Sequence, residues 1–422
     1  MSRIVIEGGH RLSGVVRVGG GKNATLPIMA ASILSAGPLV LENVPRLNDV
    51  DTMGKVINAL GVNTERLPNG DWKLHSPGGV REEAPYELVK AMRASFFVMG
   101  PLLARLKKAR VPLPGGCAIG VRPVNIHLKG FEALGARVSL EAGCAVAVAD
   151  RLVGARILLD FPSVGATENL MMAACLAEGT TLIENAACEP EIADLAGFLN
   201  AMGGRVTGAG TPTITIEGVK ELGECRYRIM PDRIDGGTFL VLGAMGTSPI
   251  TVENVVASHQ QAVITKLQEM GAELEIEENR ITVSRKGRLK PVEFKTLPFP
   301  GFPTDMQAQF MVALCLAEGT SIINETVFEN RFMHVAELSR MGAQIAIRDR
   351  TVVINGVEKL NGAPVAATDL RAGAALVMAG LNAEGRTEVS NVHHIDRGYE
   401  DLVPRLMGLG AQIKRLDGNG HG

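Results

Sequence analysis

The sequence predicts an α/β fold of two pseudo-symmetric domains, each built from three copies of one repeat. Three observations lead to this prediction: the chain has 422 residues, a short motif recurs six times, and each repeat alternates helical and strand patterns. A chain of this length exceeds one ordinary hydrophobic core and is expected to divide into domains of roughly 200 residues. Its hydrophobic content of 46% is sufficient for two large cores.

The repeat is marked by a tripeptide of Leu or Met, then Gly, then a small residue, at intervals of 68 to 74 residues. An amphipathic helix is expected to end at each of these glycines, as the apolar spacing of Val50, Met53, Ile57 and Leu60 shows for the first repeat. Glycine suits a left-handed helix C-cap. The six glycines are Gly61, Gly135, Gly203, Gly271, Gly342 and Gly410.

A second marker, AEGT or a related tetrapeptide, completes the unit. An Ala-, Met- and Leu-rich helix is expected to end at its glycine, and a strand such as TLIEN (181–185) follows. After the amphipathic helix comes a β-hairpin, as in AQIAIRDRTVVING (343–356). A repeat scaffold for protein binding is one interpretation, but so long and mixed a unit favours two closed bodies that face a cleft.

Each Ala-rich helix is preceded by a polar head at an equivalent place in its repeat. The heads contain Lys22, Arg93, Ser163, Arg233, Asp305 and Arg371. Basic residues are unfavourable at a helix N-terminus, which already carries partial positive charge. Their recurrence therefore favours an anion-binding site over solvated surface charge. For Asp305 alone, an ordinary helix start after Pro303 is the simpler explanation.

The second repeat lacks the AEGT marker and has KKARVPLPGGCAIGVRPVNIH (107–127) in its place. This Pro- and Gly-rich stretch predicts a long surface loop, the kind of segment in which function concentrates. It contains Cys117 and, five residues later, Arg122. A lone cysteine is usually an inert small hydrophobe, but a loop position beside a cation favours a reactive thiolate. Cys175 and Cys315 lie in apolar helices and are expected in the core.

Composition excludes several functional classes. The formal charge of −2 and the aromatic content of 4% argue against a nucleic-acid-binding protein. No apolar stretch is long enough for a membrane span or a signal peptide, so a soluble cytoplasmic protein is expected. The six cysteines form no CxxC pair, the histidines show no ligand spacing, and GGGKN departs from a Walker A loop. Neither a metal nor an organic cofactor is expected.

Six motifs, in order along the chain, resemble the UDP-N-acetylglucosamine 1-carboxyvinyltransferase family of enolpyruvyl transferases. The motifs are GGGKNA, LPGGCAIGVRP, FPTDMQAQF, ETVFENRFMH, ATDLRA and HIDRGYE. The resemblance implies two inverted α/β barrels of three repeats each: residues 21–229, and residues 1–20 joined to 230–422, with the active site in the cleft between them. It also implies transfer of the enolpyruvyl group of phosphoenolpyruvate to the 3-hydroxyl of UDP-N-acetylglucosamine, with release of phosphate. This would be the first committed step of peptidoglycan precursor synthesis.

The resemblance assigns roles to residues of this chain. Asp305 would be the base that also orients the hydroxyl, and Cys117 the proton donor. Lys22, Arg122 and Arg397 would clamp the phosphoenolpyruvate anions, with Arg331 and Arg371 nearby, and Asn23 would hydrogen-bond the reacting groups. Asp369 would assist proton transfer or orient Arg397; the alternative is that it is only a helix cap beside Arg371. Residues implied to contact the UDP-sugar are Arg93, Arg122, Pro123, Val124, Asn125, Ile126, Ser163 and Val327.

This chain departs from the family at Asn125, where many members have Asp, and at Phe161-Pro162, where some have a lysine nearby. The expected partners are the two small-molecule substrates, with no nucleic acid, membrane or obligate protein partner. Two alternatives remain open: a shikimate-phosphate-type enolpyruvyl transferase, and a catalytically silent paralogue that binds a UDP-sugar.

Overall fold

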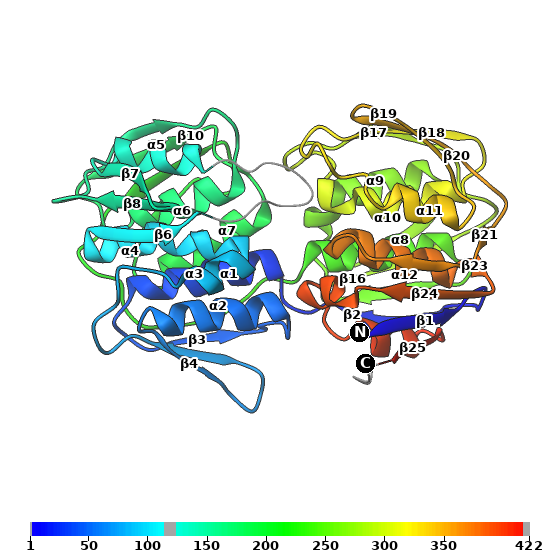
Figure 1. Cartoon of the computed structure of the whole chain (residues 1–422), viewed down its shortest axis with the longest axis horizontal. Coiled ribbons are helices and arrows are strands. Elements are labelled where there is room, and N and C mark those ends of the chain that lie inside the picture. Colours follow the sequence, from blue (N-terminus) through cyan, green and yellow to red (C-terminus); the bar gives the residue numbers. More distant parts are fainter. Residues whose placement is uncertain (1, 114–123, 417–422) are drawn as a thin grey trace. The chain divides into compact units, whose positions relative to one another are not determined.

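The structure is a computed structural model that describes residues 2–113 and 124–416 (Figure 1). These residues form two compact units with separate hydrophobic cores. The first unit contains residues 20–113 and 124–230, and the second unit contains residues 2–19 and 231–416. Cys117, Arg122 and Pro123 lie outside the described residues.

The first unit contains three α/β repeats. The elements of its first repeat are α1 (Lys22–Ala31), a 3-10 turn (Ser32–Leu34), β3 (Leu39–Glu42), α2 (Asn48–Ala59), β4 (Asn63–Arg66) and β5 (Trp72–His75). Those of its second are α3 (Tyr86–Ala91), the 3-10 helix η2 (Arg93–Val98), α4 (Met99–Leu106), β6 (Lys108–Pro112), α5 (Asn125–Ala133), β7 (Arg137–Glu141) and β8 (Cys144–Val148). Those of its third are β9 (Arg156–Leu158), α6 (Val164–Ala174), β10 (Thr180–Glu184), α7 (Pro190–Ala201), β11 (Arg205–Thr207), β12 (Thr213–Glu217) and β13 (Cys225–Arg228).

The strands of the first unit form one sheet per repeat. Their orders are β13-β3-β5-β4, β6-β8-β7 and β11-β12-β10-β9. The last strand, β13, pairs in parallel with β3 of the first repeat, so the third repeat closes back onto the first.

The second unit repeats this plan with both ends of the described chain. Its first repeat contains β2 (Gly14–Arg17), α8 (Arg233–Met245), β14 (Ile250–Glu253), η3 (Ala257–Gln260), α9 (Gln261–Glu269), β15 (Ala272–Ile276) and β16 (Arg280–Arg285). Its second contains β17 (Glu293–Lys295), η4 (Thr304–Met306), α10 (Gln307–Cys315), β18 (Thr320–Asn324), α11 (Val335–Arg340), β19 (Gln344–Arg348) and β20 (Thr351–Asn355). Its third contains β21 (Leu360–Asn361), β22 (Pro364–Ala366), α12 (Leu370–Leu381), β23 (Ala383–Glu384), β24 (Arg386–Ser390), η5 (Val392–Arg397), α13 (Leu402–Gly408), β25 (Gln412–Leu416) and β1 (Arg3–Glu7).

The N-terminal strand β1 is central to the last sheet of the second unit. The sheet order is β22-β24-β1-β25, and Val5 lies opposite Glu388 on one side and Lys414 on the other. The other sheets of this unit are β15-β16-β14-β2, β17-β18-β20-β19 and the short pair β21-β23. Strand β2 pairs in parallel with β14.

The Ala-, Leu- and Met-rich helices are buried on almost every side. In α8, all residues from Ile234 to Met245 are buried, because a helix that is apolar all round belongs in a core. Helix α10 packs against α8 and α12, and α6 packs against α1 and α4.

The repeat glycines have the conformation that the sequence predicts. All six adopt φ values between 89° and 102°, in the region that disfavours side chains, and each directly follows the C-cap of an amphipathic helix. The hairpin expected within residues 343–356 is β19-β20, with antiparallel pairing. These predictions are confirmed.

Two boundary predictions are wrong. Helix α8 ends next to its AEGT-type glycine, Gly246, as predicted. Helices α6, α10 and α12 instead end four or five residues before their own glycines, because a short turn connects each helix to the next strand. The loop expected over 107–127 is also too long. Residues Lys108–Pro112 form β6, since Ala109 and Val111 alternate into the core, and α5 begins at Asn125. Within the described ranges, no helix has the length and hydropathy needed to cross a membrane.

Candidate active site

The polar heads lie at helix starts, as the repeat alignment predicts. Their positions are Lys22 first in α1, Arg93 first in η2 before α4, Ser163 as N-cap of α6, Arg233 first in α8, Asp305 within η4 before α10, and Arg371 second in α12. Ser163 makes a true cap, because its hydroxyl accepts a hydrogen bond from the Ala166 amide at 3.3 Å. The helix starts therefore carry the candidate chemistry in both units.

In the second unit, Asp305 is held between two buried arginines. Its Oδ1 accepts a hydrogen bond of 2.8 Å from Arg331 Nη2. Its Oδ2 accepts two hydrogen bonds of 3.1 Å, from Arg371 Nε and Nη2. The side chains of Arg331 and Arg371 are 5% and 3% exposed, whereas that of Asp305 is 26% exposed. The carboxylate of Asp305 is therefore the part of this cluster that solvent can reach. Burial lowers the pKa of Arg371, but attraction to Asp305, Tyr399 and Asp232 outweighs burial and raises it overall.

A buried carboxylate, Glu325, connects this cluster to the end of β18. Its Oε2 accepts a hydrogen bond from the Thr304 hydroxyl at 2.9 Å, and Thr304 Oγ1 in turn accepts one from Arg331 Nη1 at 3.3 Å. Its Oε1 accepts hydrogen bonds from the Val327 and Phe328 amides at 2.9 and 3.1 Å. Glu325 thereby fixes the backbone of Val327 relative to η4, where Asp305 lies.

Asp369 makes helix-capping contacts. Its Oδ1 accepts hydrogen bonds from the amides of Arg371 and Ala372 at 2.9 and 3.0 Å. Its neighbour His334 is fully buried, and burial, with a further contribution from Arg331, lowers the pKa of His334 to about 4 although Asp369 opposes this shift. His334 is therefore neutral at physiological pH.

Arg397 is half-buried at the end of η5.

In the first unit, Lys22 forms a close ion pair with Asp49. Lys22 Nζ lies 2.6 Å from Asp49 Oδ2, with side chains that are 12% and 6% exposed. Asn23 follows Lys22 in the first turn of α1, whose N-cap, Gly21, provides no side-chain cap. Asp49 thus orients the ammonium group at this helix start.

A buried histidine, His127, lies in the electrostatic field of Arg93. His127 Nδ1 accepts a hydrogen bond from Asn169 Nδ2 at 3.0 Å when the histidine is neutral with its proton on Nε2. Burial and the Arg93 charge lower the pKa of His127 to about 3, so this neutral form persists. A Cβ on Gly165 would lie 3.4 Å from His127 Cε1, so glycine leaves room here in the first turn of α6. These contacts bring the starts of η2 and α6 together.

The remaining predicted residues of the first unit lie at the start of α5. Val124 is its N-cap, Asn125 is exposed and Ile126 is half-buried. Hydrogen bonds connect Asp305 with Arg331 and Arg371 in the second unit and, through Thr304 and Glu325, with the backbone of Val327. Lys22, Arg93 and Ser163 have separate partners in the first unit.

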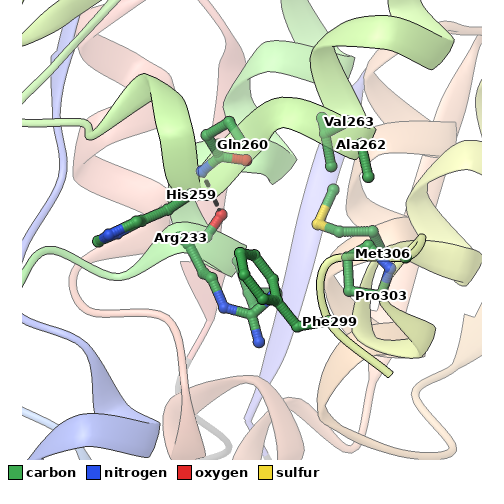
Figure 2. Close-up of a pocket in the computed structure, with 10 residues that line it drawn as sticks. Arg233, His259, Gln260, Ala262, Val263, Phe299, Pro303 and Met306 are labelled. Carbon is green, nitrogen blue, oxygen red and sulfur yellow. Dashed lines mark hydrogen bonds between the residues drawn. The ribbon is translucent and has the colours of Figure 1, made fainter. Parts of the chain in front are cut away.

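A small pocket lies at the start of α8, where Arg233 and Ile234 contribute to its lining. Figure 2 shows Gln260, Phe299 and Met306 among its lining residues, with Gln260 Nε2 donating to the Arg233 carbonyl at 2.5 Å. The Arg233 guanidinium lies 5.8 Å from the centre of the Phe299 ring. Met306, which directly follows Asp305 in η4, contributes to the lining, but the Asp305 side chain does not.

The described part of the chain contains no candidate metal site, because no three His, Cys, Asp or Glu side chains there are arranged to hold an ion. Cys175 and Cys315 are buried as predicted, and burial raises the pKa of each thiol to about 12. They are therefore unreactive core residues.

Sequence reasoning missed the partners that hold the candidate residues. Asp49, Glu325 and His334 have no distinguishing sequence pattern of their own. The available signal was membership in a notable segment: His127 ends the 107–127 stretch, and Glu325 and His334 are the first and last residues of the ETVFENRFMH motif.

Comparison with known proteins gives the class first. The sequence model of the EPSP synthase family, 3-phosphoshikimate 1-carboxyvinyltransferase, matches residues 6–406. The enolpyruvyl transferase NikO from Streptomyces tendae superposes with a TM-score of 0.88 at 26% identity, covering 98% of each chain. An EPSP synthase from Acinetobacter baumannii shares the fold, with a TM-score of 0.78 at 18% identity over 99% of this chain and 100% of the other. The chain is an enolpyruvyl transferase with the two-domain α/β fold of that class.

Full-length relatives then define the family. UDP-N-acetylglucosamine 1-carboxyvinyltransferase 2 of Carboxydothermus hydrogenoformans is 56% identical over 419 residues, covering 99% of this chain and 100% of the relative. UDP-N-acetylglucosamine 1-carboxyvinyltransferase 1 of Staphylococcus aureus (strain bovine RF122) is 54% identical over 420 residues, covering 99% and 100%. The chain belongs to the UDP-N-acetylglucosamine 1-carboxyvinyltransferase family.

Proposed function

We propose that this enzyme transfers the enolpyruvyl group of phosphoenolpyruvate to the 3-hydroxyl of UDP-N-acetylglucosamine and releases phosphate. The observation that carries the proposal is the identity of 53–56% along nearly the whole chain to relatives named for this activity. The arginine-held Asp305 supports it, because the reaction needs a positioned carboxylate beside cationic groups.

Asp305 is the base in this proposal, and it orients the sugar hydroxyl. Its oxygens accept hydrogen bonds from buried guanidinium groups, while its side chain remains partly exposed for an incoming hydroxyl. Held in this way, the carboxylate cannot rotate freely, which favours productive proton abstraction. Arg331 and Arg371 act mainly on Asp305, because they donate hydrogen bonds to it.

The phosphoenolpyruvate anions are then held by Lys22, Arg122 and Arg397. The Lys22 ammonium is oriented by Asp49 at the start of α1, where helix amides also favour an anion. Asn23 is next in the same turn and can hydrogen-bond the reacting groups. Arg331 and Arg371 add to the positive potential around them.

Contacts to the nucleotide sugar come from Arg93, Ser163, Val327 and residues 122–126. The N-terminal end of α6 at Ser163 offers amides to a diphosphate. The backbone of Val327 is fixed by Glu325, which suits a residue that contacts substrate through its main chain. The exposed Asn125 can hydrogen-bond without adding the negative charge that Asp would bring.

Cys117 donates the proton to the enolpyruvyl methylene carbon in this proposal, and Asp369 either caps α12 or also assists proton transfer. Cys117→Ser should abolish or sharply reduce turnover while leaving the fold intact, as circular dichroism can verify. Full activity in that variant would remove the thiol from any essential role.

The reaction supplies a precursor of peptidoglycan, and we infer that the enzyme acts in the cytoplasm, where nucleotide sugars and phosphoenolpyruvate occur. Cell-wall synthesis, cell shape and cell division would then depend on it. The two substrates are its proposed partners, without an obligate protein partner.

The deciding experiment measures phosphate release from phosphoenolpyruvate with UDP-N-acetylglucosamine, with shikimate 3-phosphate, and with no acceptor. Release only with the nucleotide sugar is the expected result. Release with shikimate 3-phosphate would assign the other class of enolpyruvyl transferase. Binding of the nucleotide sugar without release would indicate a silent sensor protein.

A further inference from the structure

The aromatic ring of Tyr399 lies against the arginine that holds Asp305. The guanidinium carbon of Arg371 is 5.4 Å from the centre of the Tyr399 ring, and both residues are almost completely buried. An arginine over an aromatic face is attracted electrostatically, most strongly where water is excluded. Tyr399 therefore faces the cation whose Nε and Nη2 meet Asp305 Oδ2.

The Tyr399 hydroxyl is fixed by residues of two other helices. It lies 3.0 Å from Thr238 Oγ1 of α8 and 3.1 Å from Gln309 Nε2 of α10. Thr238 donates its only hydroxyl proton to the Ile234 carbonyl at 2.7 Å, so its oxygen is an acceptor for Tyr399. Tyr399 thus donates to Thr238 and accepts from Gln309, an arrangement that requires a neutral phenol. Burial raises the pKa of Tyr399, in agreement with that state.

We propose that Tyr399 is a positioning residue that sets the plane of the Arg371 guanidinium and thereby orients Asp305. Its hydroxyl makes hydrogen bonds to side chains of α8 and α10, and its ring packs against Arg371 of α12, so Tyr399 connects these three helices. Tyr399 does not touch the reacting atoms in this role. The inference rests on the proposed function, since turnover is its readout.

Two substitutions separate the ring from the hydroxyl. Tyr399→Leu removes the face under Arg371 and should lower kcat about 30-fold, the change that about 2 kcal/mol gives at 1.4 kcal/mol per tenfold. Tyr399→Phe keeps the ring but loosens it, and should lower kcat about 5-fold. In both variants the Kd for UDP-N-acetylglucosamine should stay within about 2-fold of wild type, because the defect concerns orientation of a carboxylate rather than substrate binding.

Tyr227 provides the matched control in the first unit. Its hydroxyl also makes a hydrogen bond, of 2.9 Å to Asp194, and its ring packs edge-on against Phe198. Tyr227→Phe and Tyr227→Leu should destabilise the protein to a similar degree, which thermal unfolding measures, and leave kcat unchanged.

A double-mutant cycle tests whether Tyr399 acts through Asp305. In an Asp305→Asn background, Tyr399→Leu should cause little further loss of residual kcat, because the group that it positions is already disabled. Equal losses with and without Asp305→Asn, or wild-type kcat in both Tyr399 variants, would overturn the inference. If Tyr399→Leu does not fold, the same cycle with Tyr399→Phe decides. Absence of phosphate release from the wild-type enzyme would instead refute the proposed function.

Discussion

Arg371 places two nitrogen atoms, Nε and Nη2, each 3.1 Å from the same carboxylate oxygen of Asp305. The planar guanidinium gives this contact a fixed direction, since two donors on one edge define the position of the shared acceptor. Because Arg371 is buried in the first turn of α12, this contact relates the start of α12 to η4.

Arg371→Lys should therefore be a severe change despite conservation of charge. A lysine ammonium is a point charge on a flexible stem and cannot reproduce the two-donor contact. We expect kcat to fall roughly 100-fold, the scale of a displaced catalytic group. Phosphate-release kinetics measure it. Arg156→Lys is the control, because Arg156 contacts both oxygens of Glu184 on the surface of the first unit, and its activity should equal that of wild type.

Asp305→Asn should lower turnover much more than it weakens binding. An amide is not a base, so the loss of kcat should be about 100- to 10,000-fold. Asparagine also leaves one of the two buried guanidiniums facing an NH2 group, so thermal unfolding must be recorded beside activity. Calorimetric titration with UDP-N-acetylglucosamine should give a Kd close to that of wild type. A variant that retains most of its kcat would remove Asp305 from the role of base.

Asp194 makes the stability of the first unit depend on pH. Burial raises the pKa of Asp194 to about 6, although hydrogen bonds from the Met230 amide and the Tyr227 hydroxyl act in the opposite direction. Since the folded pKa exceeds the unfolded value, this side chain contributes most to stability below about pH 4, and the contribution is lost as pH rises to about 6. Above pH 6 the charged form costs up to about 3 kcal/mol.

Asp194→Asn should remove this pH dependence and stabilise the protein above pH 6. The amide can accept from Met230 and donate to Tyr227, whose hydroxyl can then donate to the Asp194 carbonyl, 2.9 Å away. Urea unfolding at pH values from 4 to 8 measures the difference between variant and wild type. Asp150→Asn on the exposed surface is the control and should show no such trend. A constant difference at every pH would contradict the assignment.

Gly130 permits the close approach of α5 to α6. A Cβ at this position would lie 2.4 Å from Leu170 Cδ2, and Leu170 is fully buried. Gly130→Ala should destabilise the first unit by about 1–3 kcal/mol and shift α5, whose start contains Asn125. The affinity for UDP-N-acetylglucosamine should fall as a result. Gly78→Ala, where a Cβ meets open space, should change neither property.

The sequence was sufficient for the repeat architecture because local chemistry encodes it. Gly61 and its five counterparts need positive φ, and the helices before them follow a 3.6-residue apolar period. The same logic placed Lys22 and Arg371 at helix starts. Alternation of Ala109 and Val111 in β6 was obscured by the neighbouring Pro- and Gly-rich residues, so that strand was mistaken for loop.

The contacts within the site depend on packing between residues far apart in the sequence, so local sequence patterns could not predict them. Asp305 and Arg371 are 66 residues apart, and no local pattern indicates which of several arginines meets which carboxylate. Glu325 and His334 were not recognised because burial, rather than residue type, gives each its role. Fold follows from periodicity, whereas charge pairing follows from tertiary structure.

The position of β1 between β24 and β25 also has a consequence for folding during synthesis. The first unit is encoded by one stretch of chain and can fold as soon as it leaves the ribosome, but β1 cannot pair on both edges until β24 and β25 have been made. At about 5–20 residues per second, that delay is roughly 20–80 seconds. Throughout this interval an apolar strand with free edges is exposed, which makes the nascent amino terminus a natural substrate for chaperones.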